Sequence, residues 1–125
     1  MDKETIINRL KSLGYEYDYA DDYSIEFTIE KTTQQILNII NCSEIPEGLI
    51  KIAVDMVCAE FLKLKKGFGL LDNAKFEQIA HSIALGDTNI QFADGSTPEQ
   101  KFDASIEHLL SGHQEDFIRY RKLVW

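Results

Sequence analysis

Apolar side chains recur three and four residues apart along most of the chain, which is the spacing of one face of an α-helix. The clearest run is Ile25, Ile29, Thr32, Ile36 and Ile40. Capping residues, first-turn prolines and glycines give the limits of the helices that this spacing predicts. The predicted helices cover about residues 2–13, 22–41, 46–66, 98–111 and 113–122. We therefore expect a mainly α single domain over residues 1–125, built as a small helical bundle.

The segment from about residue 46 to 66 is the most apolar part of the chain and predicts the central helix of the bundle. Pro46 stands in its first turn, where a missing N–H is harmless, and glycines 67 and 69 would end it. Apolar side chains between Leu49 and Leu64 cover most of the circumference and leave only a thin polar stripe. Such a helix is buried on nearly all sides, so we expect the other helices to surround it.

From Phe76 onward the pattern changes to an alternation of larger and smaller side chains. Alternating runs on both sides of Gly86-Asp87 predict a β-hairpin over about residues 77–93, inserted into the bundle with Gly86-Asp87 as its loop. A lone hairpin is marginally stable in water, so we expect another subunit to cover this one. The side chains expected at that subunit interface are Ile79, Ile83, Leu85, Ile90 and Phe92.

The segment from residue 120 to 125 combines aromatic, aliphatic and basic side chains. Terminal segments are normally polar and frayed unless something fixes them. Tyr, Trp and Arg are also the residue types that dominate the binding energy of protein interfaces. We therefore expect a docking segment here. Its expected contact residues are Tyr120, Arg121, Leu123, Val124 and Trp125.

The charge of the chain narrows its possible partners. Its 125 residues include 13 Lys and Arg against 21 Asp and Glu, which gives a net charge of −8. Proteins that grip nucleic acid neutralise phosphates with basic side chains, so specific DNA binding is not expected. Cys42 and Cys58 lack metal-ligand spacing and are typical of free thiols in a reducing cytoplasm. With no signal peptide or membrane span in the sequence, we expect a soluble protein and no membrane partner.

The polar residues contain no recognised catalytic or metal-binding pattern. His81, His108 and His113 have no ligand or base at a suitable spacing. An acidic run lacks the central glycine of a calcium loop and indicates a solvated helix face instead. Its members are Asp18, Asp21, Asp22, Glu26 and Glu30. We therefore expect a protein that is not an enzyme, with no catalytic, metal-binding or cofactor-binding residues and no cofactor.

The order of these elements resembles the head–tail connector family of tailed bacteriophages and prophages, also called adaptor or head-completion proteins. The resemblance covers nearly the whole chain. It is carried by four stretches, at residues 21–26, 45–64, 82–92 and 120–125. The third is similar to the family's serine-to-glycine-aspartate turn, and the fourth is similar to its basic, aromatic end.

The resemblance implies a structural role at the neck of the virion, where head and tail meet. The chain, made in the cytoplasm of the bacterial host, would form a ring, expected to be a dodecamer, beneath the portal protein. The ring would extend the DNA channel, and DNA would pass through it without specific binding. Its other partner would be the next tail-side connector or stopper protein. The hairpin would lie against neighbouring subunits or line the inner side of the ring, and residues 120–125 would reach into the portal.

A DNA-packaging or DNA-recognition protein, such as a terminase small subunit, is the alternative. These proteins are also helical and ring-forming, but they carry a basic helix-turn-helix. The basic groups here are Lys63, Lys65 and Lys66, and Arg119, Arg121 and Lys122. Cations near the end of a helix are expected from the helix dipole alone. An enzyme with an unrecognised site would instead require a deep polar pocket.

Overall fold

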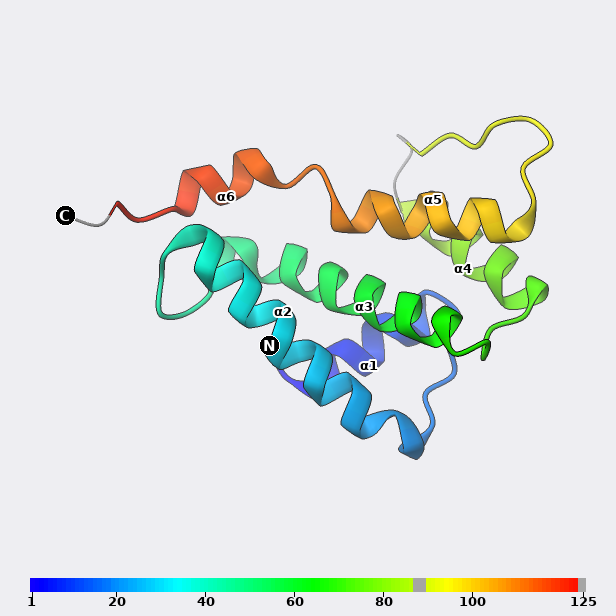
Figure 1. The fold of residues 1–125 in the computed structure, drawn as a ribbon, viewed down its shortest axis with the longest axis horizontal. Coiled ribbons are helices and arrows are strands. Elements are labelled where there is room, and N and C mark those ends of the chain that lie inside the picture. Colours follow the sequence, from blue (N-terminus) through cyan, green and yellow to red (C-terminus); the bar gives the residue numbers. More distant parts are fainter. Residues whose placement is uncertain (87–89, 124–125) are drawn as a thin grey trace.

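Helices make up most of the chain in the computed structural model, which describes residues 1–86 and 90–123 (Figure 1). The helices are α1 (Lys3–Ser12), α2 (Asp22–Ile40), α3 (Ile50–Gly67), α4 (Asn73–Gly86), α5 (Pro98–Leu110) and α6 (Gln114–Tyr120). Two short 3-10 turns, η1 (Tyr19–Asp21) and η2 (Glu47–Leu49), precede α2 and α3. No strand occurs within the described ranges. The prediction of a mainly α fold is confirmed.

The ends of several helices follow directly from local sequence. The Asp2 carboxylate accepts a hydrogen bond from the Thr5 N–H at 2.9 Å and caps α1. Thr97 and Gln100 form a reciprocal capping box at the start of α5, with Pro98 in the first turn. Asn41 ends α2 in the left-handed conformation, with φ of 56°. These signals explain why the predicted limits of the helices lie close to the observed ones.

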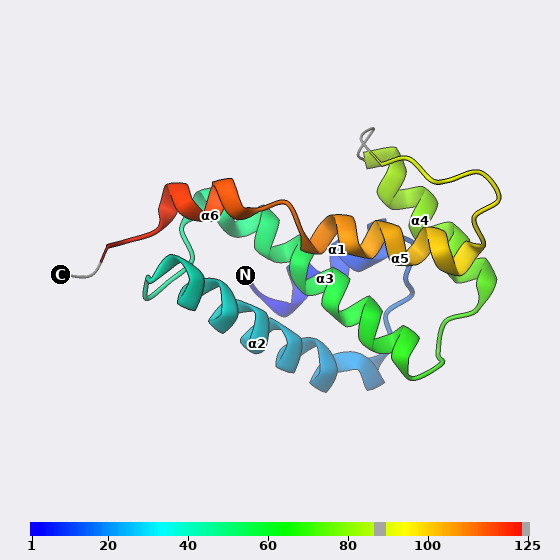
Figure 2. The same ribbon diagram turned by 45° about the horizontal axis from the view of Figure 1, so that its top comes forward.

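Helix α3 lies at the centre of the bundle, as its apolar character predicts. It packs against α1, α2 and α5, which lie on different sides of it (Figures 1 and 2). Its buried side chains occupy several faces and include Phe61 and Leu62, which are fully buried. A helix with such a wide apolar surface is stable only when neighbours cover it, so α3 organises the rest of the fold.

The buried apolar side chains form two clusters. The larger joins α1, α3, α4, α5 and the start of α2, with Phe61 and Phe102 among its fully buried members. The smaller lies near the end of α2 and contains Ile36, Ile40, Leu49, Ala53 and Phe117. Phe117 is the contribution of α6, so the smaller cluster fastens this short helix to α2 and α3.

The predicted β-hairpin over residues 77–93 is wrong, because residues up to Gly86 form α4. The Asp72 carboxylate accepts a hydrogen bond from the Lys75 N–H at 2.9 Å and starts the helix. The buried residues of α4 are Phe76, Ile79, Ala80 and Ile83, which follow the helical period. A strand would place Ala80 on the face opposite to Ile79 and Ile83, yet all three side chains are buried. Asp87, the second residue of the predicted loop, lies outside the described residues.

The loss of the hairpin also changes the role of its predicted interface residues. Ile79 and Ile83 are buried in the larger cluster of this same chain, so they do not face a neighbouring subunit. Ile90 and Phe92 are half-buried in an irregular segment that leads to α5, and Ile90 packs on the larger cluster. Leu85 differs from the others because 72% of its side chain is exposed.

Candidate functional site

Helix α6 is held to the rest of the protein by two aromatic side chains. Phe117 is buried in the smaller cluster, and the half-buried Tyr120 packs against the same cluster. The Tyr120 ring lies directly over Gly48, where a Cβ atom would come within 1.9 Å of the phenol oxygen. Gly48 therefore creates the space that Tyr120 occupies. Tyr120 is a structural residue of this chain, although the sequence predicts it as a docking residue.

The segment that follows α6, residues 121–123, is called the C-terminal arm below. Its backbone is fixed to the end of α2, because the Lys122 N–H donates to the Ile40 carbonyl at 2.8 Å. The Asn41 side-chain amide donates to the Lys122 carbonyl at 3.1 Å. The Ile40 carbonyl has no partner within its own helix, so this contact satisfies a group that a helix end leaves open.

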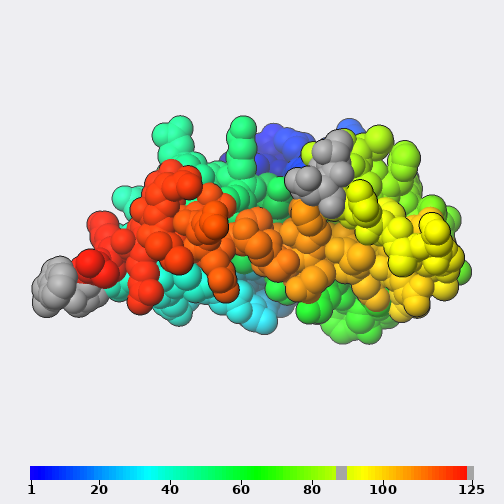
Figure 3. Space-filling model, turned by 90° about the horizontal axis from the view of Figure 1, so that it is seen from above, coloured from blue at the N-terminus to red at the C-terminus, as the bar shows by residue number. Residues whose placement is uncertain are grey.

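The side chains of the C-terminal arm remain exposed although its backbone is fixed. Leu123 is 72% exposed, and Arg121 and Lys122 are also exposed. Figure 3 shows this end of the molecule, in red, projecting beyond the helices. Of the predicted docking residues, Arg121 and Leu123 are therefore accessible to a partner. Val124 and Trp125 lie outside the described residues.

A second exposed apolar surface lies beside the C-terminal arm. Ile39 of α2 is 48% exposed and Ile118 of α6 is 70% exposed. Together with Gln114, Phe117 and Arg121 they line a shallow depression of about 360 Å³. We call Ile39, Ile118 and the neighbouring Arg119 the α6 face. Large aliphatic side chains exposed together in this way are typical of a protein contact.

A row of exposed aromatic side chains runs along the other end of α2. Tyr19, Tyr23 and Phe27 are 84%, 79% and 53% exposed, and we call them the aromatic row. The Tyr23 and Phe27 rings stack with their centroids 6.4 Å apart. Their spacing of four residues, offset from the buried Ile25, is a sequence signal for one exposed helical stripe. The sequence interpretation missed it because these residues lie within an acidic run.

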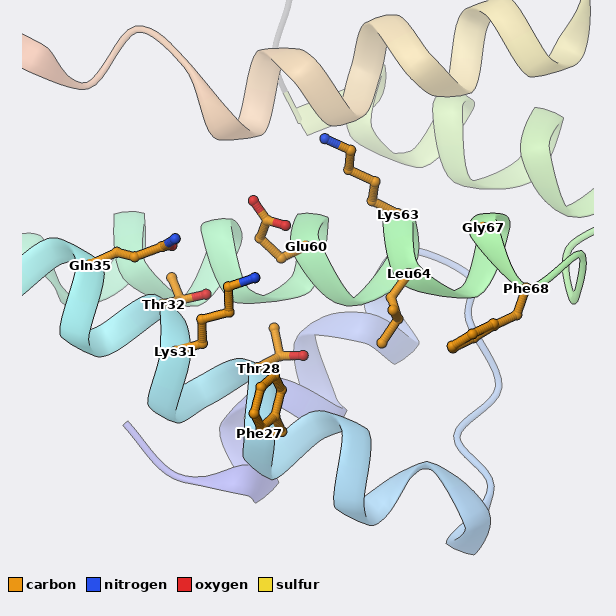
Figure 4. A pocket seen from close by; sticks show the side chains of 10 residues that line it. All are labelled: Phe27, Thr28, Lys31, Thr32, Gln35, Glu60, Lys63, Leu64, Gly67 and Phe68. Atoms are coloured by element: carbon orange, nitrogen blue, oxygen red, sulfur yellow. The ribbon is translucent and has the colours of Figure 1, made fainter.

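A groove between α2 and α3 begins at Phe27 (Figure 4). It has a volume of about 400 Å³, and Leu64 and Phe68 form its apolar part. Lys31 and Lys63 flank it without an ion-pair partner among the described residues. The groove is open and combines apolar and cationic groups. Thr28, Thr32, Gln35 and Glu60 add polar groups to its lining.

A buried polar cluster fixes the turn that carries the aromatic row. The Asp21 carboxylate accepts hydrogen bonds from Lys65 Nζ at 2.8 Å and from the Tyr15 hydroxyl at 2.7 Å. The Asp18 N–H also donates to it, at 3.1 Å. Burial alone would raise the pKa of Asp21, but these hydrogen bonds outweigh it and hold the pKa below its ordinary value. The prediction of a solvated acidic face is therefore wrong for Asp21, which is buried.

The remaining polar chemistry of the chain is sparse. Burial raises the pKa of the Cys58 thiol to about 12, so this cysteine stays protonated and unreactive at neutral pH. Among the residues that the structure describes, no group of His, Cys, Asp and Glu side chains is arranged to hold a metal ion. Within the same ranges, no helix is both long enough and apolar enough to cross a membrane.

Comparisons of the chain with models of protein families, with curated proteins and with solved structures give no match. The resemblance to head–tail connectors therefore rests on the sequence stretches given above and stays a prediction.

Proposed function

We propose that this chain is a structural virion protein of the head–tail connector type, without enzymatic activity. In this proposal it forms a ring beneath the portal protein, connects the phage head to the tail and extends the DNA channel. The observation that carries the proposal is the C-terminal arm, whose backbone is fixed while its Leu123 side chain is 72% exposed. A fixed backbone with exposed apolar and basic side chains is suited to docking into another protein.

The fixed backbone of the C-terminal arm lowers the entropic cost of binding. The hydrogen bonds of Lys122 to Ile40 and Asn41 already hold the arm in one conformation. Binding of a partner to Arg121 and Leu123 would therefore fix fewer rotatable bonds, and lose less conformational entropy, than binding to a flexible tail. Arg is also enriched among the residues that dominate binding energy. We propose the portal protein as the partner of this arm.

The acidic surface supports a role in a channel for DNA. A net charge of −8 repels phosphates, so DNA that passes through a ring of such subunits is not retarded by contacts with Lys and Arg. The proposed assembly has twelve copies at the neck of the virion. Its second partner is the next tail-side connector or stopper protein, and synthesis takes place in the cytoplasm of the bacterial host.

The test is co-purification with the portal protein encoded in the same genome. Leu123→Asp places a charge in the proposed contact. Removal of the chain after Lys122 deletes Leu123 but keeps the hydrogen bonds that join Lys122 to the Ile40 carbonyl and to the Asn41 side chain. Tyr120 must stay, because it packs on the smaller cluster. We expect both variants to lose at least about tenfold in portal affinity, which corresponds to about 1.4 kcal/mol.

Leu85→Asp is the matched control for Leu123→Asp, because the two leucines are both 72% exposed. We expect this control to bind the portal like the wild-type chain. Equal portal affinity of wild type, Leu123→Asp and the truncated chain would contradict the proposal. Duplex DNA binding that weakens steeply with added salt would instead favour the packaging alternative.

A further inference from the structure

Charge is strongly segregated along the chain. Residues 15–30 contain acidic side chains and no Lys or Arg, whereas residues 117–123 contain Arg119, Arg121 and Lys122 and no acid. The acidic residues are Glu16, Asp18, Asp21, Asp22, Glu26 and Glu30. The first segment carries the aromatic row, and the second carries the C-terminal arm with Ile118 and Arg119 of the α6 face. The aromatic row is therefore surrounded mainly by acids, with Lys31 and Lys63 beside Phe27. The α6 face is flanked mainly by bases, with Asp116 beside Arg119.

Much of this charge is not neutralised within the chain. Lys65 pairs with Asp21, and Lys3 lies 3.5 Å from both Asp22 and Glu26. Glu30, one turn beyond Glu26, has no ion-pair partner among the described residues. Among Arg119, Arg121 and Lys122, the one ion pair within the described residues joins Arg119 to Asp116 at 3.7 Å, and Arg119 remains 69% exposed. Opposite charges that lack a partner within their own chain attract each other across an interface.

The apolar parts of the two surfaces also complement each other. The aromatic row offers the flat, exposed rings of Tyr23 and Phe27, and the α6 face offers the branched side chains of Ile39 and Ile118. An Arg guanidinium also packs well over a Tyr or Phe ring, which adds a cation–π contribution. Contact between the two surfaces would bury apolar side chains that are exposed in the single chain.

The two surfaces cannot meet within one molecule, because they lie at opposite ends of α2 (Figures 1 and 2). Tyr23 stands in the first turn of α2, and the C-terminal arm bonds to Ile40 in the last turn. At a rise of about 1.5 Å per residue, these positions are roughly 25 Å apart along the helix. Only a second copy of the chain can bring the surfaces together.

We propose that the α6 face of one copy binds the aromatic row of the next copy. Such a head-to-tail contact joins two different surfaces and therefore continues from copy to copy, giving a ring when the rotation closes. The inference deepens the proposed function, on which it rests, by naming the contact between ring subunits. It leaves Leu123 to the portal and assigns Ile118 and Arg119 to the neighbouring subunit.

Disulfide cross-linking of two different single-cysteine additions tests this contact directly. One preparation carries Tyr23→Cys and the other Ile118→Cys, and the two are mixed and oxidised. We expect a cross-linked dimer in the mixture and much less in either preparation alone. The wild-type chain is oxidised in parallel, because Cys42 is only half-buried while Cys58 is buried. A mixture of Ala104→Cys, an exposed position on α5, with Ile118→Cys is the matched control.

Charge exchange then tests whether the residues named above form the contact. Glu30→Arg in the Tyr23→Cys chain, or Arg119→Glu in the Ile118→Cys chain, is expected to lower the yield of the cross-link by about tenfold. The mixture that contains both reversals restores opposite charges across the contact, so its yield is expected to recover. If the substitutions lowered the yield by unfolding the chains, the yield would not recover in the mixture that contains both reversals.

The outcomes separate this inference from the proposed function. A cross-link between residues 23 and 118 together with unchanged portal binding by Leu123→Asp would support the contact and contradict the portal role of the arm. Absence of the 23–118 product would overturn the inference whatever the portal does. A product in which Tyr23→Cys, or Ile118→Cys, joins mainly to itself would also overturn it, because it indicates a symmetric dimer.

Discussion

Helix α4 and the C-terminal arm carry similar apolar side chains, but most of those of α4 are buried, with Leu85 as the exception. Ile79 and Ile83 are almost completely buried, whereas Leu123 is 72% exposed. The reason is that α4 has a neighbour within the chain. It packs against α5, and the rings of Phe76 and Phe102 lie 4.8 Å apart. The C-terminal arm is held mainly through its backbone, by hydrogen bonds to Ile40 and Asn41 at the end of α2 and to the Ile118 carbonyl of α6, and its Leu123 side chain stays exposed.

The difference teaches that apolar composition alone does not indicate a docking segment. Both segments are predicted from sequence to require a second subunit, but in the folded chain Ile79 and Ile83 are buried, and only Leu85 of α4 stays as exposed as Leu123. An exposed apolar side chain on a fixed backbone is the informative feature, because it remains available after the chain has completed its own core. Apart from Leu85, the predicted interface residues within 77–93 therefore no longer indicate a contact with another subunit.

The largest change in stability is expected from a substitution on the buried face of α4. Ile79→Ala removes a fully buried side chain and leaves a cavity, so we expect the free energy of unfolding to fall by about 4 kcal/mol. Leu123→Ala should change it by less than about 0.5 kcal/mol. Urea unfolding of both variants measures the difference. Equal losses would contradict the distinction between the two segments.

The next largest change in the free energy of unfolding is expected from a substitution of Lys65, which lines the same depression as Ile79. Lys65→Met leaves the buried Asp21 carboxylate without its cation, which should cost about 3 kcal/mol at neutral pH. The pKa of Asp21 is lowered in the folded chain, so its stabilising contribution is present above the ordinary value of 3.8. That contribution is lost as the pH falls through the folded pKa.

Measurement of the unfolding free energy of wild type and Lys65→Met from pH 7 to pH 3 checks this sign. We expect the gap between the two proteins to narrow below about pH 4, because protonated Asp21 no longer needs the ammonium group. Glu60→Gln is the control, because Glu60 lies on α3 like Lys65 but forms no ion pair among the described residues. A gap that widens on acidification would contradict the assignment of Asp21.

A smaller loss of stability is expected from Gly48→Ala, which tests whether the contact between Gly48 and Tyr120 positions α6 and the C-terminal arm. The new Cβ would overlap the Tyr120 ring and displace α6, at a cost of about 2 kcal/mol. In a background of Tyr120→Ala the same substitution should cost much less, because the ring is already absent. Additive losses in this double-mutant cycle would show that Gly48 acts on something other than Tyr120.

The smallest effect is expected at the hydrogen bond that holds the C-terminal arm. Asn41→Gly keeps the left-handed conformation at the end of α2 but removes the side-chain donor to the Lys122 carbonyl. We expect a loss of about 1 kcal/mol or less in stability. Amide hydrogen exchange at Lys122 should become faster while exchange within α4 stays unchanged. Faster exchange in α4 would contradict a local role for Asn41.

Local signals predict the helices well and fail where burial depends on distant residues. Thr97, Pro98 and Gln100 mark the start of α5 unambiguously, because capping is decided within one turn. The burial of Ala80 and Ile83 depends on α5, which follows later in the chain, and small side chains at 80, 82 and 84 imitate a strand. The period alone cannot decide between the two forms in so short a segment.

The candidate surfaces were predictable in part. Arg121 and Leu123 were predicted as docking residues, and their exposure agrees with such a role. Tyr120 could not be separated from them by sequence, because its burial depends on the absence of a side chain at Gly48. The stripe that includes Tyr23 and Phe27 was visible as a spacing of four residues. Its exposure became clear only once the buried face of α2 was known.

Hydrogen exchange of the chain with and without the portal protein tests the central claim most directly. We expect the portal to slow exchange at residues 121–123 and to leave residues 74–86 of α4 unchanged, because the apolar face of α4 is already buried within the chain. Slower exchange in α4 with no change at residues 121–123 would contradict a docking role for the C-terminal arm.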